Sequence, residues 1–312
     1  MNIFSVTFSN VLLTLLYLIP GFLLCRIGKV RAEHTSSIST ILLYVCGPCM
    51  FLNSLTDLDL SAELSVRMLL FFAVTLATEV IFLALMFLAL GQKRKEFSFR
   101  IMSLASVMGN VGFFGLPIVR AAFPDTPEAA AYSCIFCASM NILAWTLGVF
   151  FLTGDRKYMS FRAAFLNPTI LAVAAGLVLY FTQAKNWMPE VLRGGIRTVG
   201  AMSTPMCMFV LGIRLSTMNL KKLFTEPVPY LASAGKLIAF PLISYLLVLP
   251  FPLAPVFKAS ILILSATPCA SIILNLAEIH HNGQETAADC ALLSTLLSIA
   301  TIPLLSLLLS IG

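Results

Sequence analysis

Long apolar stretches alternate with short polar ones along the whole chain. A helix that crosses a bilayer needs about 20 mostly apolar residues. Ten stretches approach or exceed this length, and no long linker separates any two of them. We therefore predict membrane-spanning helices at residues 5–25, 38–56, 65–91, 101–121, 128–152, 167–184, 194–214, 228–250, 254–278 and 285–311.

The composition agrees with a chain that lies almost entirely in a lipid bilayer. Hydrophobic residues make up 59% of the sequence, charged residues 11%, and the mean hydropathy is +0.95. Soluble domains carry about 25% charged residues. We predict an all-α polytopic membrane protein of the cell (plasma) membrane. The net charge of +6 is spread over short clusters between the spans, which argues against nucleic acid as a partner.

Basic residues concentrate after the first, third, fifth and seventh spans. These four places hold 13 of the 20 Lys and Arg residues: Arg26, Lys29, Arg31, Lys93, Arg94, Lys95, Arg100, Arg156, Lys157, Arg162, Arg214, Lys221 and Lys222. Short loops rich in Lys and Arg face the cytoplasm. The prediction is that these four loops are cytoplasmic and that both termini are extracytoplasmic.

The fourth span contains residues that weaken a helix. Gly109, Asn110, Gly112, Gly115 and Pro117 lie within nine positions of each other. Each glycine costs a helix interior about 1 kcal/mol relative to alanine, and proline costs about 3 kcal/mol. Broken backbone within a membrane is tolerated where protein or a water-filled cavity satisfies its polar groups. Glycines also let helices pack closely, but the neighbouring asparagine and proline favour a binding site.

A second interruption occurs in the ninth span, at Ala266–Ser271, and includes Thr267 and Pro268. Pro117 and Pro268 are 151 positions apart, which is close to half of the 312 residues. Five spans followed by five spans place the second half upside down, as in many secondary transporters. We expect a first repeat at 1–152 and a second, inverted repeat at 153–312.

Two interrupted helices offer a site for an anion. A half-helix presents the positive end of its dipole at its N-terminus. Asparagine both donates and accepts hydrogen bonds, and serine and threonine hydroxyls can do the same. The predicted substrate-binding residues are therefore Gly109, Asn110, Gly112, Gly115, Pro117, Thr267, Pro268, Ser271 and Asn275.

Glu79 in the third span and Lys236 in the eighth are the clearest charges inside the membrane. A charge at the centre of a membrane helix costs about 2.5–3.5 kcal/mol on insertion scales. We predict that they form a proton-titrating or charge-compensating pair beside the substrate path. A structural ion pair, or a Lys236 side chain that reaches the membrane surface, would also explain them.

Two other sets of residues suggest chemistry less strongly. Cys46-Gly47-Pro48-Cys49 has the spacing of a redox motif, but it lies in an apolar span, where a proline-kinked helix is the better interpretation. A turn explains His280, His281, Glu285 and Asp289 better than a metal site does. No cofactor and no metal are expected.

Several stretches together resemble the auxin efflux carrier family of secondary transporters. They are Gly109–Pro117, Pro48–Leu55, Leu276–Glu278 and Leu293–Leu304. Asn53, within the second of these, joins the predicted substrate-binding residues. About fifteen residues join the fifth and sixth spans, which is similar to the short microbial members rather than to plant members with a long central loop.

This resemblance implies ten helices in two inverted repeats, with helices four and nine broken and crossing at their prolines. It implies a scaffold of helices 1, 2, 6 and 7, often in a homodimer, and a transport domain of helices 3–5 and 8–10. It also places the family's substrate asparagine at Asn110. Plant members export auxin, and bacterial members are commonly assigned to malate, malonate or related acids.

The sequence thus predicts a secondary active transporter that moves a small organic anion by alternating access, with H⁺ or Na⁺ as the coupling ion. The alternative is a membrane-embedded thiol oxidoreductase that uses Cys46 and Cys49.

Overall fold

The computed structural model describes residues 2–218, 223 and 225–310. Two basic residues of the predicted fourth cytoplasmic loop, Lys221 and Lys222, lie outside these ranges, as do the last two residues of the chain. The described residues form helices and no named strand, with one isolated β-bridge between Gly109 and Cys269. The all-helical membrane class is therefore confirmed.

The apolar helical segments coincide with the predicted stretches. Among the described residues, seven are long and apolar enough to cross a membrane: Ile3–Arg26, His34–Thr56, Ala62–Ala89, Glu128–Thr153, Glu190–Thr217, Pro227–Val248 and Gln284–Leu309. Three are shorter: Val111–Ala122, Pro168–Phe181 and Pro255–Ser265. The predicted spans 101–121 and 254–278 are each divided into two helical pieces by a non-helical segment.

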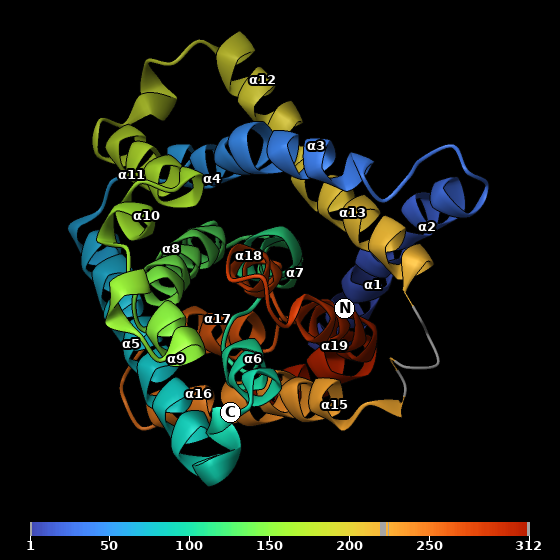
Figure 1. The fold of residues 1–312 in the computed structure, drawn as a ribbon. Coiled ribbons are helices and arrows are strands. Elements are labelled where there is room, and N and C mark those ends of the chain that lie inside the picture. The colour runs from blue at the N-terminus through green and yellow to red at the C-terminus, as the bar shows by residue number, and fades with distance from the viewer. Residues whose placement is uncertain (1, 219–222, 224, 311–312) are drawn as a thin grey trace.

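We divide the described elements into two groups, which also share extensive contacts, above all those of α1 with α19. The first contains α1 (Ile3–Leu16), α2 (Leu18–Arg26), α3 (His34–Ile41), α4 (Gly47–Thr56), α10 (Phe161–Phe165), α11 (Pro168–Phe181), α12 (Glu190–Ala201) and α13 (Ser203–Thr217). In this group α2 packs on α13, and α11 and α12 pack on α4. These helices run along one side of the molecule in Figure 1.

The second group contains α5 (Ala62–Ala89), α6 (Phe97–Ala105), α7 (Leu116–Ala122), α8 (Glu128–Leu143), α9 (Val149–Thr153), α15 (Pro227–Ala234), α16 (Phe240–Val248), α17 (Pro255–Ser265), α18 (Ile272–Ile279) and α19 (Gln284–Ser306). Here α5 packs on α8, α15 on α19 and α16 on α17. The short helices α7 and α18 lie at the centre of the view in Figure 1. The groups meet where α1 contacts α19 and α7, and where α11 contacts α8.

Several helices begin next to a residue that satisfies the free N–H groups of the first helical turn. Ser61 precedes α5 and its hydroxyl accepts from the Leu64 N–H at 3.4 Å. Asn167 precedes α11, accepts from the Ile170 N–H at 3.0 Å, and is followed by Pro168. The first N–H groups of a helix have no partner within the helix. A side-chain acceptor at the N-cap pairs with one of them, and a proline in the first turn lacks the N–H group altogether.

Four π-helical turns interrupt the spans: η1 (Leu42–Cys46), η3 (Val111–Gly115), η4 (Ala144–Gly148) and η7 (Gly235–Ala239). Three of them end just before a proline in the next helix, namely Pro48, Pro117 and Pro241. Proline has no N–H to donate and its ring clashes with the preceding turn of an α-helix. The wider π-turn absorbs this mismatch. The predicted proline kink of the second span is thus a π-turn followed by Pro48.

Candidate functional site

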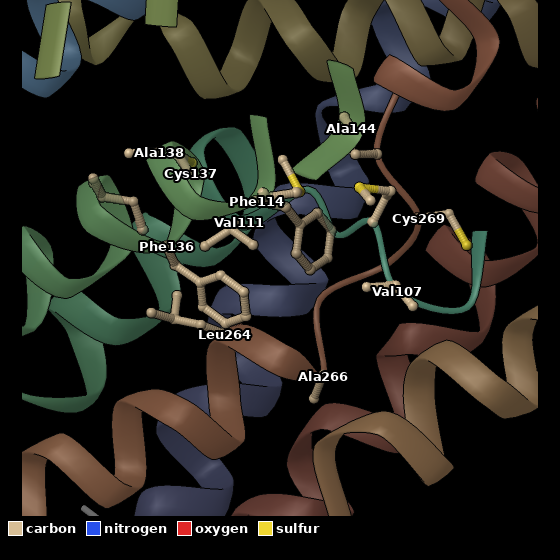
Figure 2. Close-up of a cluster of buried hydrophobic side chains, with 14 of the residues drawn as sticks. Val107, Val111, Phe114, Phe136, Cys137, Ala138, Ala144, Leu264, Ala266 and Cys269 are labelled. Carbon is tan, nitrogen blue, oxygen red and sulfur yellow. The ribbon is translucent and has the colours of Figure 1, made fainter. Parts of the chain in front are cut away.

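The two interrupted spans cross each other at the centre of the molecule. The Asn110 N–H donates to the Pro268 carbonyl at 2.7 Å, and the Ala270 N–H donates to the Met108 carbonyl at 3.0 Å. These two bonds flank the antiparallel bridge between Gly109 and Cys269. Figure 2 shows the unwound segments passing each other among buried side chains that include Val107, Phe114 and Leu264. We call the segments Ser106–Asn110 and Ala266–Ser271 the crossing.

Side chains satisfy other backbone groups that the crossing frees from helical hydrogen bonds. The Cys269 N–H donates to the Ser294 hydroxyl at 2.9 Å, and the Cys269 thiol donates to the Ala105 carbonyl at 3.1 Å. The buried Lys236 amine donates to the Ser265 carbonyl. Unpaired backbone groups are costly in a membrane interior. The backbone groups that are freed at the crossing therefore have specific hydrogen-bond partners in the fold.

Gly109 allows these segments to approach closely. A β-carbon at this position would lie 2.6 Å from Thr267 Oγ1 and 2.9 Å from Lys236 Nζ. Real β-carbons do not come this close to other atoms, so any larger residue here displaces the threonine or the lysine. Lys236 thus reaches the crossing itself, and its ammonium also lies 4.7 Å from the centre of the Phe240 ring.

The position of the crossing corrects one expectation. The resemblance implied that the helices cross at both prolines, but only Pro268 lies in the crossing. Pro117 lies seven positions after Asn110, in the first turn of α7. The chain unwinds at Gly109 and Asn110 instead, and the π-turn Val111–Gly115 accommodates the proline that follows.

Asn110 marks the start of the half-helix at 111–122. Its carbonyl accepts from the N–H groups of Phe114 at 3.1 Å and Gly115 at 3.0 Å. Its side chain does not cap the helix, and the amide instead faces Cys207 Sγ of α13 at 3.7 Å. The Asn110 amide thus connects the broken span to a helix of the other group.

A cavity of about 280 Å³, here called the crossing cavity, opens at both half-helix N-termini. It is lined by five of the predicted substrate-binding residues: Gly109, Asn110, Gly112, Ser271 and Asn275. It also receives side chains that the sequence did not single out, among them Asn141, Trp145, Asn167 and Arg214. Amide and guanidinium groups thus converge here between largely apolar walls, which suits a small ligand with a negatively charged group.

The other five predicted substrate-binding residues do not line the crossing cavity, and one of them, Pro268, lies in the crossing itself. Thr267 belongs to the crossing, where it is fully buried and packs against Gly109 and Gly115. Neither Gly115 nor Thr267 lines the crossing cavity. Asn53 and Pro117 line a different cavity of about 290 Å³, called here the second cavity, together with Arg120 and Arg197.

Neighbouring residues of the same helical segments line the two cavities. In 34–56, Phe51 lines the crossing cavity, and Met50 and Asn53 line the second cavity. In 190–217, Cys207 lines the crossing cavity and Thr204 the second cavity. These segments therefore separate the two cavities.

The wall between the cavities is held by contacts near the middle of these segments. The Thr204 hydroxyl donates to the Phe113 carbonyl at 2.7 Å and joins α13 to the π-turn after the crossing. The Cys46 thiol lies 3.5 Å from the Met206 sulfur and joins η1 to α13. The first of these contacts links the two packed groups of helices.

The two charges inside the membrane do not form an ion pair. Glu79 and Lys236 are both fully buried, and no contact of 4.0 Å or less between their charged atoms occurs in the described structure. Lys236 points into the crossing, so it does not reach the membrane surface. Neither carboxyl oxygen of Glu79 makes a hydrogen bond to the described residues. The structural ion pair and the surface-reaching lysine are therefore both wrong.

The residues considered for redox or metal chemistry fit ordinary roles. Cys46 and Cys49 are unpaired thiols in a helical span. Within the part of the chain that the structure describes, no cluster of three metal-ligating side chains occurs. His280 follows α18 and packs edge-on against Tyr158 at 5.0 Å between ring centres. Burial, with a smaller contribution from His281, lowers its pKa.

Comparisons with known proteins match nearly the whole chain. Residues 6–306 match the family described as "Membrane transport protein". An uncharacterised transporter of Methanocaldococcus jannaschii is 24% identical over 305 residues, which cover 94% of this chain and 96% of the relative. A "Putative malonate transporter" of Rhizobium meliloti is 25% identical over 294 residues, covering 90% of this chain and 89% of the relative. The resemblance to the auxin efflux carriers is confirmed, and the chain belongs to the membrane transport protein family as a transporter rather than an enzyme.

Proposed function

We propose that this protein is a secondary active transporter of small organic carboxylates. The observation that carries the proposal is the crossing, at which two half-helix N-termini and the Asn110 amide line one cavity. Backbone N–H groups and the helix dipole at such ends attract a carboxylate. Apolar side chains such as Val111 and Phe113 line the same cavity and would contact the carbon skeleton.

One relative supports the class of substrate. The Rhizobium meliloti protein carries a description that names malonate, and it aligns with 90% of this chain. We propose malonate, malate or a related short acid as substrate, and place an auxin-like acid second, because the cavity volume of about 280 Å³ is at the small end for ligand sites.

The two cavities support transport by alternating access. The crossing cavity opens near Ser39, Asn167 and Arg214, at the ends of segments that lead into the basic loops. If those loops are cytoplasmic, this conformation exposes the substrate site to the cytoplasm, and the second cavity faces the other side. Movement of the crossing past the scaffold would then expose the substrate site through the second cavity instead of the crossing cavity.

This proposal includes the inverted repeat, with the boundary between residues 152 and 153. The second group of helices described above would be the transport domain and the first group the scaffold. The division of both 101–121 and 254–278 into two pieces supports a common plan for the two halves. A homodimer formed through the scaffold is also proposed, and the 89% exposed Val191 on α12 offers an apolar contact.

Coupling to H⁺ or Na⁺ is proposed to involve the two buried charges. Lys236 places an amine at the crossing, where it donates to the Ser265 carbonyl. Glu79 is a fully buried carboxyl group without a hydrogen-bond partner among the described residues. Such intramembrane carboxyl groups are candidates for proton uptake and release.

Malonate uptake into proteoliposomes tests the proposal with Asn110→Ala. We expect uptake to fall at least about tenfold, because the substrate loses an amide partner in a site from which water is largely excluded. Asn186→Ala, at an exposed position outside both cavities, is the matched control and should transport normally. Undiminished uptake by Asn110→Ala would contradict the proposed site.

A further inference from the structure

Arg214 is the single charged side chain among the described residues that line the crossing cavity. It lies in the last turn of α13, on the same face as Cys207 and Val210, which also line the cavity. Residues three and seven positions apart share one face of a helix. The guanidinium is therefore carried on the cavity side of the helix rather than on its lipid side.

The position of Arg214 relative to the crossing follows from α13. Cys207 touches the Asn110 amide at 3.7 Å. Seven helical residues span about 10 Å, so the backbone of Arg214 lies roughly that far along the cavity from the Asn110 contact. An arginine side chain covers much of such a distance. A short ligand held at the crossing can therefore also reach the guanidinium.

Arg214 has no partner of its own in the described part of the chain. It is half-buried, and no ion pair or side-chain hydrogen bond involves it. Glu278 on α18 interacts with it electrostatically but forms no contact within 4.0 Å. A partly buried guanidinium without a partner is unfavourable, because it loses water without gaining a hydrogen bond.

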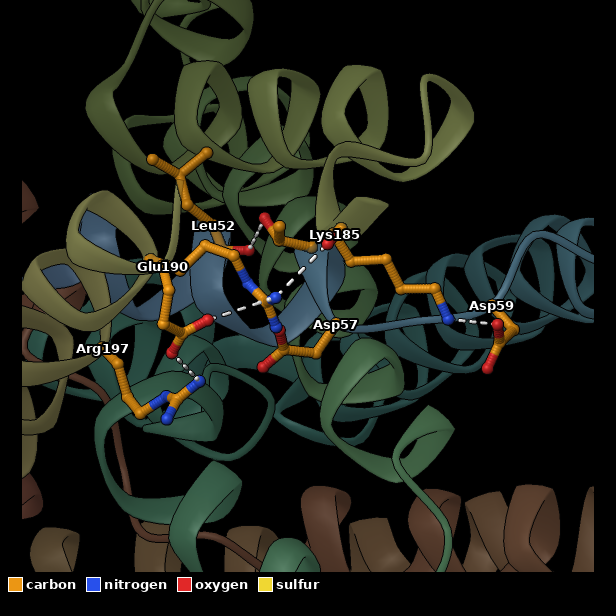
Figure 3. A network of polar contacts seen from close by, with 8 residues as sticks. Leu52, Asp57, Asp59, Lys185, Glu190 and Arg197 are labelled. Atoms are coloured by element: carbon orange, nitrogen blue, oxygen red, sulfur yellow. Dashed lines mark hydrogen bonds and ion pairs between the residues drawn. The ribbon is translucent and has the colours of Figure 1, made fainter. Parts of the chain in front are cut away.

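Two other arginines of the first group of helices, Arg193 and Arg197, are paired. Arg193 contacts Asp57 at 2.9 Å and Glu190 at 3.4 Å, and Arg197 contacts Glu190 at 3.8 Å. Figure 3 shows Arg197, Glu190 and Asp57 in this network, near the end of α4. Carboxylates thus pair with these two arginines, whereas Arg214 in the crossing cavity has no such pair among the described residues.

We propose that Arg214 binds a second carboxylate of the substrate, so that the cavity selects dicarboxylates over monocarboxylates. The inference rests on the proposed function, in which the crossing binds the first carboxylate. The planar guanidinium can donate two parallel hydrogen bonds to a carboxylate, and it keeps its charge at every physiological pH. A monocarboxylate would leave this group unpaired.

Two simpler roles also explain a basic residue at the end of α13, and the experiment must distinguish them from ligand binding. Cations stabilise the last turn of a helix and accumulate on the cytoplasmic side of membranes. Either role would be independent of the ligand. Selectivity between ligands that differ only in one charge is therefore the decisive measurement.

The experiment measures the dissociation constants of malonate and of its monomethyl ester for the purified protein. The ester has the same skeleton but only one carboxylate. We expect the wild type to bind malonate at least about tenfold more tightly than the ester, and Arg214→Gln to abolish this preference by weakening malonate alone. Arg214→Lys keeps the charge and should retain part of the preference.

Two further variants separate the outcomes. Asn110→Ala should weaken both ligands alike, because it acts on the shared carboxylate. Glu278→Gln should leave the preference unchanged, whereas an Arg214 that serves only to pair with Glu278 would make Glu278→Gln behave like Arg214→Gln. A wild type without preference, or an Arg214→Gln variant that keeps it, overturns the inference and leaves the proposed function intact. If the wild type binds neither ligand and transports no carboxylate, the proposed function itself fails.

Discussion

Glu79 and Lys236 are both buried within the membrane spans, but they differ in their hydrogen bonds. Lys236 bonds to a carbonyl that the crossing releases, whereas Glu79 has no hydrogen-bond partner among the described residues. The lysine is thus tied to the architecture of the site. The Glu79 carboxyl group has no comparable bond to the crossing.

The first prediction at this scale concerns Glu79→Gln. Glutamine keeps the shape of the side chain but cannot titrate, so we expect the pH dependence of substrate uptake to disappear. Glu63→Gln alters the same helix at its exposed end, where Glu63 pairs with Arg67, and should keep the wild-type profile. An unchanged profile in Glu79→Gln would remove Glu79 from the coupling mechanism.

The second prediction concerns Gly109→Ala. The added methyl group would lie 2.6 Å from Thr267 Oγ1, and we expect a loss of about 1–3 kcal/mol in stability together with reduced uptake. Gly194→Ala is the control, because a β-carbon there has no neighbour within 4 Å. Its thermal midpoint in detergent should equal or slightly exceed that of the wild type, since alanine favours the helix. Equal thermal midpoints for Gly109→Ala and the wild type would contradict the close approach of Gly109 to Thr267.

At the scale of elements, the crossing depends on helix α19 as well as on the two broken spans. Ser294 of α19 accepts a hydrogen bond from the Cys269 N–H. Ser294→Ala leaves that buried N–H unpaired, at a cost of about 1–3 kcal/mol. Ser298→Ala removes only a bond to the Thr295 carbonyl of its own helix and should cost less than about 1 kcal/mol. Thermal unfolding in detergent compares the two, and equal losses would argue against a special role for Ser294.

Apolar length and helix-breaking residues predicted the positions of the helices and of both interruptions. They could not predict the π-turns, because a proline in a span fits either a kink or a wider turn. They also could not place Asn53 and Pro117 in a second cavity, since that depends on which face each helix presents. Arg214 was counted with the cytoplasmic basic residues, because a linear count of charges does not show that α13 turns this side chain inward.

At the scale of the whole molecule, the Thr204 contact with Phe113 lies between two cavities. The proposed alternating access requires that these cavities open to opposite sides of the membrane. The relation between the two openings can be tested by chemical labelling from each side of the membrane.

The labelling experiment uses a transport-competent parent chain in which Cys25, Cys49, Cys137 and Cys207 are replaced by alanine. The first two are half-buried and the last two line the crossing cavity. Asn275→Cys in this parent should react with a membrane-impermeant thiol reagent from one side, and saturating malonate should slow the reaction. Asn53→Cys should react from the opposite side. Reaction of both cysteines from the same side would refute the two-sided arrangement.

The hydrogen bonds of the crossing join Gly109 and its neighbours to residues around Cys269, 160 positions later in the chain. During biosynthesis the first interruption therefore enters the bilayer long before its partner has been translated. Until then its amides need water, a neighbouring helix or the insertion machinery as a temporary partner. Maturation of the binding site is consequently a late event, and a chain that stops before the ninth span should be recognised by quality control as unfinished.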